Sequence, residues 1–292
     1  GGEKTIKNGA SGGGKSRTGR PAGGEGALMD NRAETERAFY FPRDEDPWVA
    51  GLFRDAENVW EGVPRIAAYI DETIAEFDAS PGPVPAGLSL HAGMIYADAP
   101  VRLEEDLFLP DLRILIRAGA AVEPGVLIKA GALIGAGAEI RQGAYLRGEA
   151  IVADGAVVGH VTEVKNSVFF TGAEAGHFAY VGDSLLGRRV NLGAGTKLAN
   201  LQLRTPEQKA GREKHAIVIE SEGRRFDTGL RKLGAVLGDD VEIGCNAVTS
   251  PGTLVGPRTW IYSNSAVRKG FYPADAIVRP ESRRMDIILK KK

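Results

Sequence analysis

The sequence has little of what marks several classes of protein. It contains one cysteine, Cys245, so no disulfide can form within the chain, and a reducing compartment is expected. No apolar run approaches the roughly 20 residues that a membrane-spanning helix needs. The 37 basic and 38 acidic residues give a net charge of −1, which indicates neither a nucleic-acid nor a membrane partner. We therefore expect a soluble, cytoplasmic protein.

Glycine, in contrast, is abundant, with 39 residues. Ten of residues 1–28 are glycine, and no apolar periodicity accompanies them, which predicts a flexible tail. Residues 9–16 match the P-loop spacing G-x-x-x-x-G-K-S, but neither a buried strand before them nor a helix after them is predicted, so we assign no phosphate site there. Met29 is the expected natural start.

Residues 29–85 are predicted to form a helical segment that ends in a proline-rich connector. Apolar residues recur at steps of three and four across residues 57–77, which predicts one face of an amphipathic helix. A shorter helix is expected over residues 47–55. The Ser-Pro-Gly-Pro-Val-Pro run at residues 80–85 ends any helix and forms a stiff connector. We expect the longer helix to cap the open end of the domain that follows.

Residues 86–280 contain a repeat of six. The same period appears in three runs, which begin at Ile116, Leu186 and Leu237. A period of six is typical of a hexapeptide β-helix, in which each hexad forms one side of a triangular coil and its aliphatic residue points inward. The predicted fold is therefore mainly β, a left-handed parallel β-helix of about six to seven coils with a short N-terminal helical segment. The first run is Ile116, Val122, Ile128, Ile134, Ile140, Leu146, Val152, Val158, Val164 and Phe170.

The three runs are out of phase with one another. The shifts predict an irregularity within residues 171–185 and an excursion loop at residues 201–235. The first part of the excursion is polar and is expected to be flexible, whereas residues 216–220 and 225–227 are predicted to pair as a hairpin. Loops that leave a rigid solenoid commonly form its binding surface. Residues 281–292 are expected to be a basic, solvated tail.

Polar residues gather where the repeat is interrupted, at residues 175–200. This stretch reads His177-x-x-Tyr180-x-Gly-Asp, followed by Asn191-x-Gly-Ala-Gly-Thr and Asn200. Packing explains the scaffold positions but not these. Arg147 and Lys165 are separated by three hexads, the length of one coil, so the two cations are expected on the same side of successive coils, which suits a phosphate. An ordinary solvated face and a structural asparagine ladder are the alternatives.

These motifs resemble the left-handed β-helix acetyltransferase domain of the bifunctional glucosamine-1-phosphate N-acetyltransferase/N-acetylglucosamine-1-phosphate uridyltransferase family, in its archaeal-type sugar-1-phosphate nucleotidylyltransferase/acetyltransferase branch. The resemblance covers about residues 57–280 and includes the Asp-Thr-Gly-x-Arg-Lys-Leu-Gly stretch at residues 227–234. It implies a homotrimer that transfers acetyl from acetyl-CoA to an amino-sugar 1-phosphate, without a metal, in UDP-N-acetylglucosamine synthesis. Glucosamine 1-phosphate is the expected substrate, and galactosamine 1-phosphate remains open.

The resemblance also implies roles for individual residues. His177 is the general base that accepts the proton of the amine as its nitrogen attacks the thioester, and Asn200 holds the amine or the acyl oxygen. The implied contacts to the sugar and its phosphate are Arg147, Lys165, Tyr180 and Asn191. The implied contacts to acetyl-CoA, in a groove between neighbouring prisms, are Cys245, Ser263, Arg268 and Arg279.

The sequence departs from this family in three places. Cys245 stands where bacterial members have a serine in contact with the cofactor. Leu-Gln-Leu follows Asn200 where bacterial members have Tyr-Asp-Gly and then a phosphate-binding lysine; Lys209, Arg212 and Lys214 are candidates to replace that lysine. The nucleotidylyltransferase half has no counterpart here, since neither its Gly-rich loop nor a βαβ alternation is found, so no uridyltransferase activity is expected from this chain.

Two other functions are weighed against acetyl transfer. One is a non-catalytic or regulatory β-helix protein that binds a sugar nucleotide or a partner nucleotidyltransferase. The other is a γ-type carbonic anhydrase, which needs three histidines that meet around a metal across a trimer. Four scattered histidines with no close pair make the second alternative the weaker one.

Overall fold

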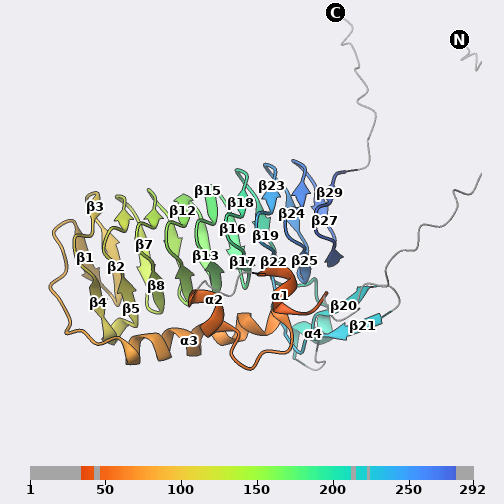
Figure 1. Cartoon of the computed structure of the whole chain (residues 1–292), viewed down its shortest axis with the longest axis horizontal. Helices are drawn as coiled ribbons and strands as arrows, with labels where there is room; N and C mark the ends of the chain where they lie inside the picture. The colour runs from red at the N-terminus through yellow and green to blue at the C-terminus, as the bar shows by residue number, and fades with distance from the viewer. Residues whose placement is uncertain (1–33, 43–46, 212–214, 222–223, 281–292) are drawn as a thin grey trace, which may run out of the picture. The chain divides into compact units, whose positions relative to one another are not determined.

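The computed structural model describes residues 34–42, 47–211, 215–221 and 224–280 (Figure 1). The chain divides into two units, Gly1–Asn31 and Arg32–Lys292, and all described residues belong to the second. The predicted flexible tail with its P-loop-like motif, Met29 and the basic C-terminal tail lie outside the described residues. So do two of the loop cations, Arg212 and Lys214.

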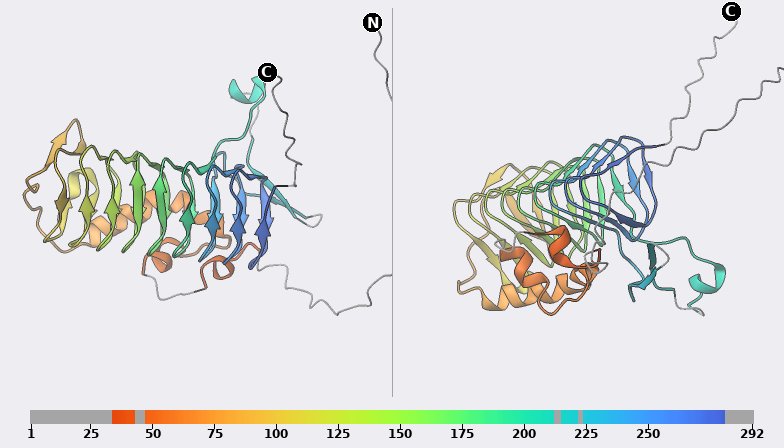
Figure 2. Two further views of the ribbon diagram at one scale, coloured as in Figure 1. Left: turned by 90° about the horizontal axis from the view of Figure 1, so that it is seen from above. Right: turned by 45° about the vertical axis from the view of Figure 1, so that its right-hand side comes forward.

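The second unit is built around three nine-stranded sheets, which form the sides of a prism (Figures 1 and 2). Sheet A contains, in spatial order, β1 (Leu88–His91), β2 (Met94–Ala97), β7 (Leu127–Lys129), β10 (Tyr145–Leu146), β13 (Glu163–Lys165), β16 (Tyr180–Gly182), β19 (Lys197–Leu198), β24 (Val248–Thr249) and β27 (Ala266–Val267). Sheet B contains β3 (Val101–Arg102), β6 (Ala121–Val122), β9 (Glu139–Ile140), β12 (Val157–His160), β15 (Glu174–His177), β18 (Asn191–Leu192), β23 (Glu242–Ile243), β26 (Trp260–Ile261) and β29 (Ile277–Val278). Sheet C contains β4 (Leu107–Leu109), β5 (Ile114–Ile116), β8 (Ala132–Ile134), β11 (Ala150–Val152), β14 (Ser167–Phe169), β17 (Leu185–Leu186), β22 (Ala235–Leu237), β25 (Thr253–Val255) and β28 (Gly270–Tyr272).

The predicted parallel β-helix is confirmed, with more layers than the six to seven coils expected. From β5 to β29, the strands of the three sheets pair in parallel from one coil to the next. The first layer is different, because β2, β3 and β4 pair antiparallel with β7, β6 and β5. This layer has no hexads, so the period of six does not reveal it. It forms the N-terminal end of the prism, and the long N-terminal helix packs on the outer face of sheet C instead, so the prediction that this helix caps the end is wrong.

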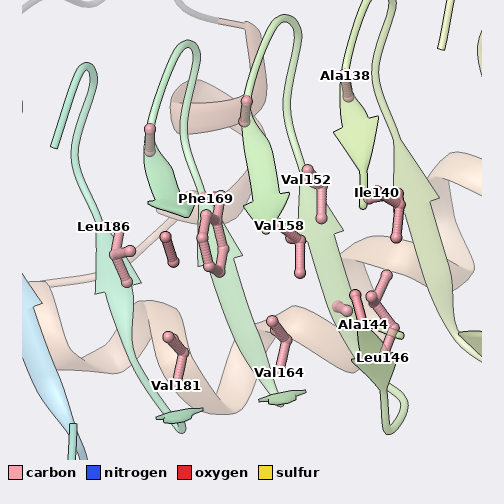
Figure 3. Close-up of a cluster of buried hydrophobic side chains, with 14 of the residues drawn as sticks. Ala138, Ile140, Ala144, Leu146, Val152, Val158, Val164, Phe169, Val181 and Leu186 are labelled. Atoms are coloured by element: carbon pink, nitrogen blue, oxygen red, sulfur yellow. The ribbon is translucent and has the colours of Figure 1, made fainter. Parts of the chain in front are cut away.

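The interior of the prism is a stack of apolar side chains (Figure 3). The predicted inward positions from Ile116 to Val164 all belong to this cluster. The next predicted position, Phe170, is wrong. Phe169 enters the interior cluster, whereas Phe170 points outward and packs on Phe41 with ring centroids 5.0 Å apart.

The inward step from Val164 to Phe169 is one residue short of a hexad, because Asn166, with a φ of 46°, turns the corner in the left-handed region. A second shortened step leads from Val181 to Leu186. The coil between Glu163 and Tyr180 is accordingly one residue shorter than the regular coil between Leu127 and Tyr145. The irregularity expected within residues 171–185 thus begins earlier and occurs twice.

The N-terminal helices lie along the outer face of sheet C (Figures 1 and 2). They are α1 (Arg37–Tyr40), α2 (Pro47–Leu52), the short 3₁₀ helix η1 (Val59–Glu61) and α3 (Gly62–Glu76). Ile66 and Ile70 of α3 belong to a second apolar cluster that also contains the outward residues of sheet C. Sheet C is therefore apolar on both faces. Its outward residues in this cluster are Phe108, Leu115, Leu133, Ile151, Val168, Leu185, Val236 and Leu254.

The excursion leaves the prism after β19 and returns at β22. Lys197 before it pairs with Val248 after it, so β19 and β24 are direct neighbours in sheet A although the whole excursion separates them in sequence. The loop contains the short helix α4 (Pro206–Lys209), which sequence analysis missed, and the hairpin of β20 (Val218–Ser221) and β21 (Arg224–Asp227). A further 3₁₀ helix, η2 (Pro110–Leu112), joins β4 to β5. Within the described ranges, none of these helices has the length and apolar character needed to cross a membrane.

Candidate functional site

A row of three cations crosses the coils at one end of the sheet A strands. Lys129 ends β7 and Lys165 ends β13, while Arg147 follows β10, and the strand register places the three side by side on successive coils. Neighbouring strands lie about 4.8 Å apart. The structure thus brings together the predicted pair, Arg147 and Lys165, and adds Lys129. Lys129 was not among the predicted residues, although it precedes Arg147 by the same three hexads that separate the predicted pair. We call these three residues the cation column.

The cation column lines an open hollow of about 580 Å³. Residues 92–94, at the turn between β1 and β2, form its N-terminal wall, and Glu149 and Asn166 complete the side nearest sheet C. Arg113 holds Glu149 through two hydrogen bonds of 2.8 and 3.2 Å, and the same bonds raise the pKa of the arginine. The carboxylate in the wall therefore has its ion-pair partner outside the hollow, a guanidinium that Asp71 shares.

The three cations differ in how far the protein compensates their charge. Arg147 donates from Nη1 to Oε1 of Glu163 at 2.8 Å, which raises the pKa of its guanidinium. Lys165 lies 3.5 Å from Oδ2 of Asp183. The ammonium of Lys129 lies over the ring of Tyr145, 5.6 Å from its centroid, and no carboxylate in the described part of the chain forms an ion pair with it. The positive charge is thus least compensated at the N-terminal end of the hollow.

A buried carboxylate organises the next part of the site. Asp183, 4% exposed, accepts hydrogen bonds from the amide of Asn166 at 2.7 Å and from the amide of Asn200. The side-chain oxygen of Asn200, Oδ1, in turn accepts from the hydroxyl of Tyr180 at 3.4 Å. Burial raises the pKa of Tyr180, and the charges of nearby carboxylates add to the effect, so the hydroxyl stays a donor at neutral pH. Asp183 therefore fixes the orientation of Asn200, a role that sequence analysis did not assign.

Glycine is required at position 182, between Tyr180 and Asp183. A Cβ atom there would lie 2.7 Å from the amide nitrogen of Asn200 and 2.7 Å from the hydroxyl oxygen of Tyr180. Both distances are shorter than a carbon atom tolerates, so a larger residue would displace the two polar groups. The absence of a side chain here keeps the hydrogen bond between Tyr180 and Asn200 in place.

His177 lies at the opposite end of the sheet A face. It ends β15 on sheet B, its side chain is exposed, and the following residue, Phe178, turns the corner toward β16 with a φ of 52°. His177 is therefore separated from Lys165 by the width of one face of the prism. Tyr180 begins β16 and lies between the two corners.

His160 occupies the same position as His177, one coil earlier, where the two residues pair in register. The expectation that the histidines form no close pair is therefore wrong. Nδ1 of His160 lies 3.1 Å from the carbonyl oxygen of Gln142, which can only accept, so this nitrogen is the donor. The ring also meets that of Phe178 edge to face, with centroids 5.2 Å apart. Among the residues with a defined placement, no three metal-ligating side chains are grouped to hold a metal ion.

The next group of predicted residues lies at sheet B: Asn191, Cys245, Ser263 and Arg279. Asn191 begins β18 and donates to Oε2 of Glu242 at 2.9 Å, away from the Tyr180 and Asn200 pair. It lines a second open hollow of about 620 Å³, together with Cys245, Ser263 and the exposed rings of Trp260 and Tyr262.

Two of the four predicted acetyl-CoA contacts, Cys245 and Ser263, therefore meet in this hollow. Arg279 follows β29, next to Pro280 in the wall of the hollow, and its side chain is exposed. Arg268 follows β27 on sheet A and lies away from the other three. Lys209, a candidate to replace the loop lysine, belongs to α4 in the excursion.

No protein-family model matches the chain. The chain is similar to the bifunctional sugar-1-phosphate nucleotidylyltransferase/acetyltransferase of Sulfurisphaera tokodaii, with 36% identity over 119 residues that cover 41% of this chain and 27% of the relative. It is also similar to the bifunctional protein GlmU of Methanococcus maripaludis, with 38% identity over 154 residues that cover 53% of this chain and 35% of the relative. The chain thus spans about a third or less of the length of these curated relatives.

Among solved structures, the acetyltransferase domain of PglB from Neisseria gonorrhoeae, in complex with acetyl coenzyme A, has a TM-score of 0.25 and 17% identity over 57% of this chain and 54% of that chain. A likeness of this size supports no argument about function. The sequence relatives and the β-helix support the same conclusion about the kind of domain. The chain carries an acetyltransferase-like hexapeptide-repeat domain that is distantly related to the bifunctional sugar-1-phosphate nucleotidylyltransferase/acetyltransferases.

Proposed function

We propose that this protein transfers acetyl from acetyl-CoA to the amino group of an amino sugar that carries an anomeric phosphate, with glucosamine 1-phosphate as the first substrate to test. The observation that supports this most is the arrangement on one face of the prism. Two cations on successive coils, Arg147 and Lys165, lie next to the Tyr180 and Asn200 pair, and the exposed imidazole of His177 stands at the adjoining corner.

The two cations are suited to hold the phosphate. Arg147 uses one of its nitrogens for Glu163, which leaves the rest of its five-donor fork for a ligand. The contact of Lys165 with Asp183 is long, at 3.5 Å, and Asp183 is already satisfied by two amides. A phosphate dianion therefore meets donors that the protein has not fully used. The sugar is then directed toward Tyr180 and Asn200, because these lie on the next coils of the same sheet.

His177 is assigned as the general base. The amine of an amino sugar is largely protonated at neutral pH and attacks only after it loses a proton. As its nitrogen forms a bond to the acetyl carbon, the bond from that carbon to the CoA sulfur breaks. The imidazole accepts the proton from nitrogen and delivers it to the departing sulfur. Proton transfer of this kind contributes roughly 10²- to 10⁴-fold to the rate. The side-chain oxygen of Asn200, Oδ1, keeps a second lone pair that can accept from the amine.

The hollow on sheet B fits the co-substrate. Trp260 and Tyr262 expose flat rings on which an adenine can stack, and the hydroxyl of Ser263 and the thiol of Cys245 line the same wall. We propose, in addition, that the protein acts as a homotrimer. The apolar surface of Trp260, Tyr262 and Ile277 on sheet B supports an assembly of copies, because sheet C is already covered by the N-terminal helices. Sedimentation equilibrium measures the mass of the assembly directly.

The experiment that tests the proposed function is a free-thiol assay with acetyl-CoA and either glucosamine 1-phosphate or galactosamine 1-phosphate. The wild-type protein should release CoA with at least one of them, and His177→Ala should lower kcat by about 100-fold or more. His160→Gln is the matched control, because it changes the neighbouring histidine of the same corner and retains a donor for Gln142.

The function is wrong if the wild-type protein releases no CoA with any amino sugar that carries an anomeric phosphate. Full activity of His177→Ala would instead overturn the assignment of the base. Binding of a sugar phosphate without any release of CoA would support the non-catalytic alternative.

A further inference from the structure

We infer that the ligand of the sheet A site is an amino sugar linked to a nucleoside diphosphate, so that the site holds two phosphates and a base in addition to the sugar. This inference rests on the proposed function, because it names the substrate class of the same site. Three observations support it: the third cation, the way in which the surrounding carboxylates are paired, and a smaller hollow on sheet A that adjoins the hollow lined by the cation column.

The cation column is longer than one phosphate requires. Strands of successive coils lie about 4.8 Å apart, so a phosphate between Arg147 and Lys165 is centred about 7 Å along the axis from the strand of Lys129. The hollow is continuous over this distance, because all three cations line it. A second phosphate, joined to the first by one bridging oxygen and displaced toward β7, meets the ammonium of Lys129.

The positive charge of Lys129 is not compensated by a carboxylate among the described residues and is available to a ligand. Three carboxylates face this region, and each already has a partner. Glu163 accepts from Arg147, and Glu149 accepts from Arg113. Asp183 lies near Lys165 and accepts from the side-chain amide of Asn166. Lys129 contacts the ring of Tyr145, which holds its side chain over sheet A without neutralising it. The second phosphate therefore meets a cation whose charge the neighbouring carboxylates do not compensate.

The direction of the ligand follows from the order of the strands. Tyr180 and Asn200, which receive the sugar, lie at β16 and directly after β19, and the first phosphate lies at β10 and β13. Whatever is attached to that phosphate must continue toward β7 and β2. A smaller hollow of about 220 Å³ lies there, lined by Tyr96, Leu127 and Met94 among others. Met94 also lines the first hollow, so the two adjoin.

This smaller hollow has the character of a nucleobase site. Its lining is mainly apolar, and Tyr96, with 39% of its surface exposed, presents an aromatic ring on the outer face of sheet A. Tyr96 is in register with Leu127, and Leu127 with Tyr145, so one aliphatic and two aromatic side chains follow one another beside the cation column. Base-to-aromatic stacking tolerates any base, so the structure assigns a nucleoside without specifying which one.

The first test measures binding without catalysis. Calorimetric titration of the full chain should show that UDP binds at least tenfold more tightly than UMP, because only UDP supplies both phosphates. Lys129→Met, which keeps the apolar stem and removes the charge, should weaken UDP at least fivefold and UMP much less. Lys269→Met is the matched control, since this lysine lies at the same corner at the far end of the prism and should leave both affinities unchanged. Tyr96→Ala should weaken UDP but not inorganic pyrophosphate.

Equal binding of UDP and UMP, or equal effects of Lys129→Met and Lys269→Met, would overturn the inference. The second test compares acetyl transfer to glucosamine 1-phosphate and to UDP-glucosamine. We expect kcat/KM to be at least tenfold higher for UDP-glucosamine, and Lys129→Met to lower it for that substrate alone. If glucosamine 1-phosphate is acetylated as efficiently and UDP does not bind, the inference fails and the proposed function stands. If UDP binds through Lys129 and neither amine is acetylated, the nucleotide site stands and the proposed function fails.

Discussion

Replacing Asp183 by asparagine should destabilise the protein more than its small change in size suggests. The carboxylate accepts from two side-chain amides, Asn166 and Asn200, through different oxygens, and it lies 3.5 Å from the ammonium of Lys165. Asparagine has one carbonyl oxygen and one NH₂ group, so one of the two amides then faces another donor. Asparagine also tolerates the left-handed backbone at this position, where φ is 46°, so the substitution adds little backbone strain.

The magnitude follows from these contacts. A hydrogen bond to a charged group contributes about 1.5–3 kcal/mol, and the partly exposed ion pair with Lys165 adds at most about 1 kcal/mol. The sum predicts a loss of about 2–4 kcal/mol in the free energy of unfolding for Asp183→Asn. Asp240 is the matched control, because it is also an aspartate in the left-handed region, with a φ of 61°, but its ion pair with Arg189 is exposed. Asp240→Asn should cost less than about 1 kcal/mol.

Urea denaturation followed by circular dichroism measures both losses under the same conditions. Asp183→Asn should also lower kcat/KM for acetyl transfer, because Asn200 and Lys165 lose a common anchor, whereas Asp240→Asn should not change it. If the two variants lose equal stability, the buried carboxylate does not organise this region and the assignment of Asp183 is refuted.

Three further predictions concern single positions. Gly182→Ala should lower kcat/KM at least tenfold with a small change in melting temperature, because its Cβ would displace the amide of Asn200 and the hydroxyl of Tyr180; unchanged kinetics would show that their hydrogen bond is dispensable. Thr249→Val should raise the free energy of unfolding by about 1 kcal/mol, since the Thr249 hydroxyl is buried in the prism and has no hydrogen-bond partner among the described residues; a loss on urea denaturation would contradict this. Burial raises the pKa of Tyr40 well above 10.0, so its contribution to stability is complete below pH 10 and is lost as the pH rises further. The melting temperature of Tyr40→Phe should therefore be lower than that of the wild type at pH 8 and approach or pass it above pH 10. A difference that stays constant with pH would show that the pKa of Tyr40 is not raised by folding.

The fold was predictable where the inward residues follow one another at the regular step of six. The ladder from Ile116 to Val164 could be read from the period of six because one residue per hexad points inward. The same logic failed at Phe169 and Phe170, which are both buried, one inside the prism and one beneath the N-terminal helices. Hydrophobicity cannot identify the inward residue when both faces of a strand are covered, and a shortened step then goes unnoticed. The antiparallel first layer escaped prediction because it has no hexads.

The candidate site was predictable as far as coil spacing and motif allow. The interval of one regular coil placed Arg147 and Lys165 on successive coils, and the motif identified Tyr180 and Asn200. The interval also held for Lys129, which the family motif does not include. The role of Asp183 depends on side-chain orientation at a left-handed corner, which spacing does not determine. The separation of Asn191 from Tyr180 follows from the corner between sheets B and A, and a motif written as a line of letters does not show it.

The base of the excursion has a consequence for how this protein can diverge. The backbone amide of Leu233 donates to the backbone carbonyl oxygen of Asn200 at 3.1 Å, so the two ends of the loop are joined beside the prism. For a flexible loop closed at its base, each doubling of length costs only about 0.6 kcal/mol. The loop can therefore be lengthened, shortened or exchanged for a different sequence while Asn200 stays anchored by Leu233 and Asp183. A lineage, or a protein engineer, can vary this loop and leave the position of Asn200 beside it unchanged.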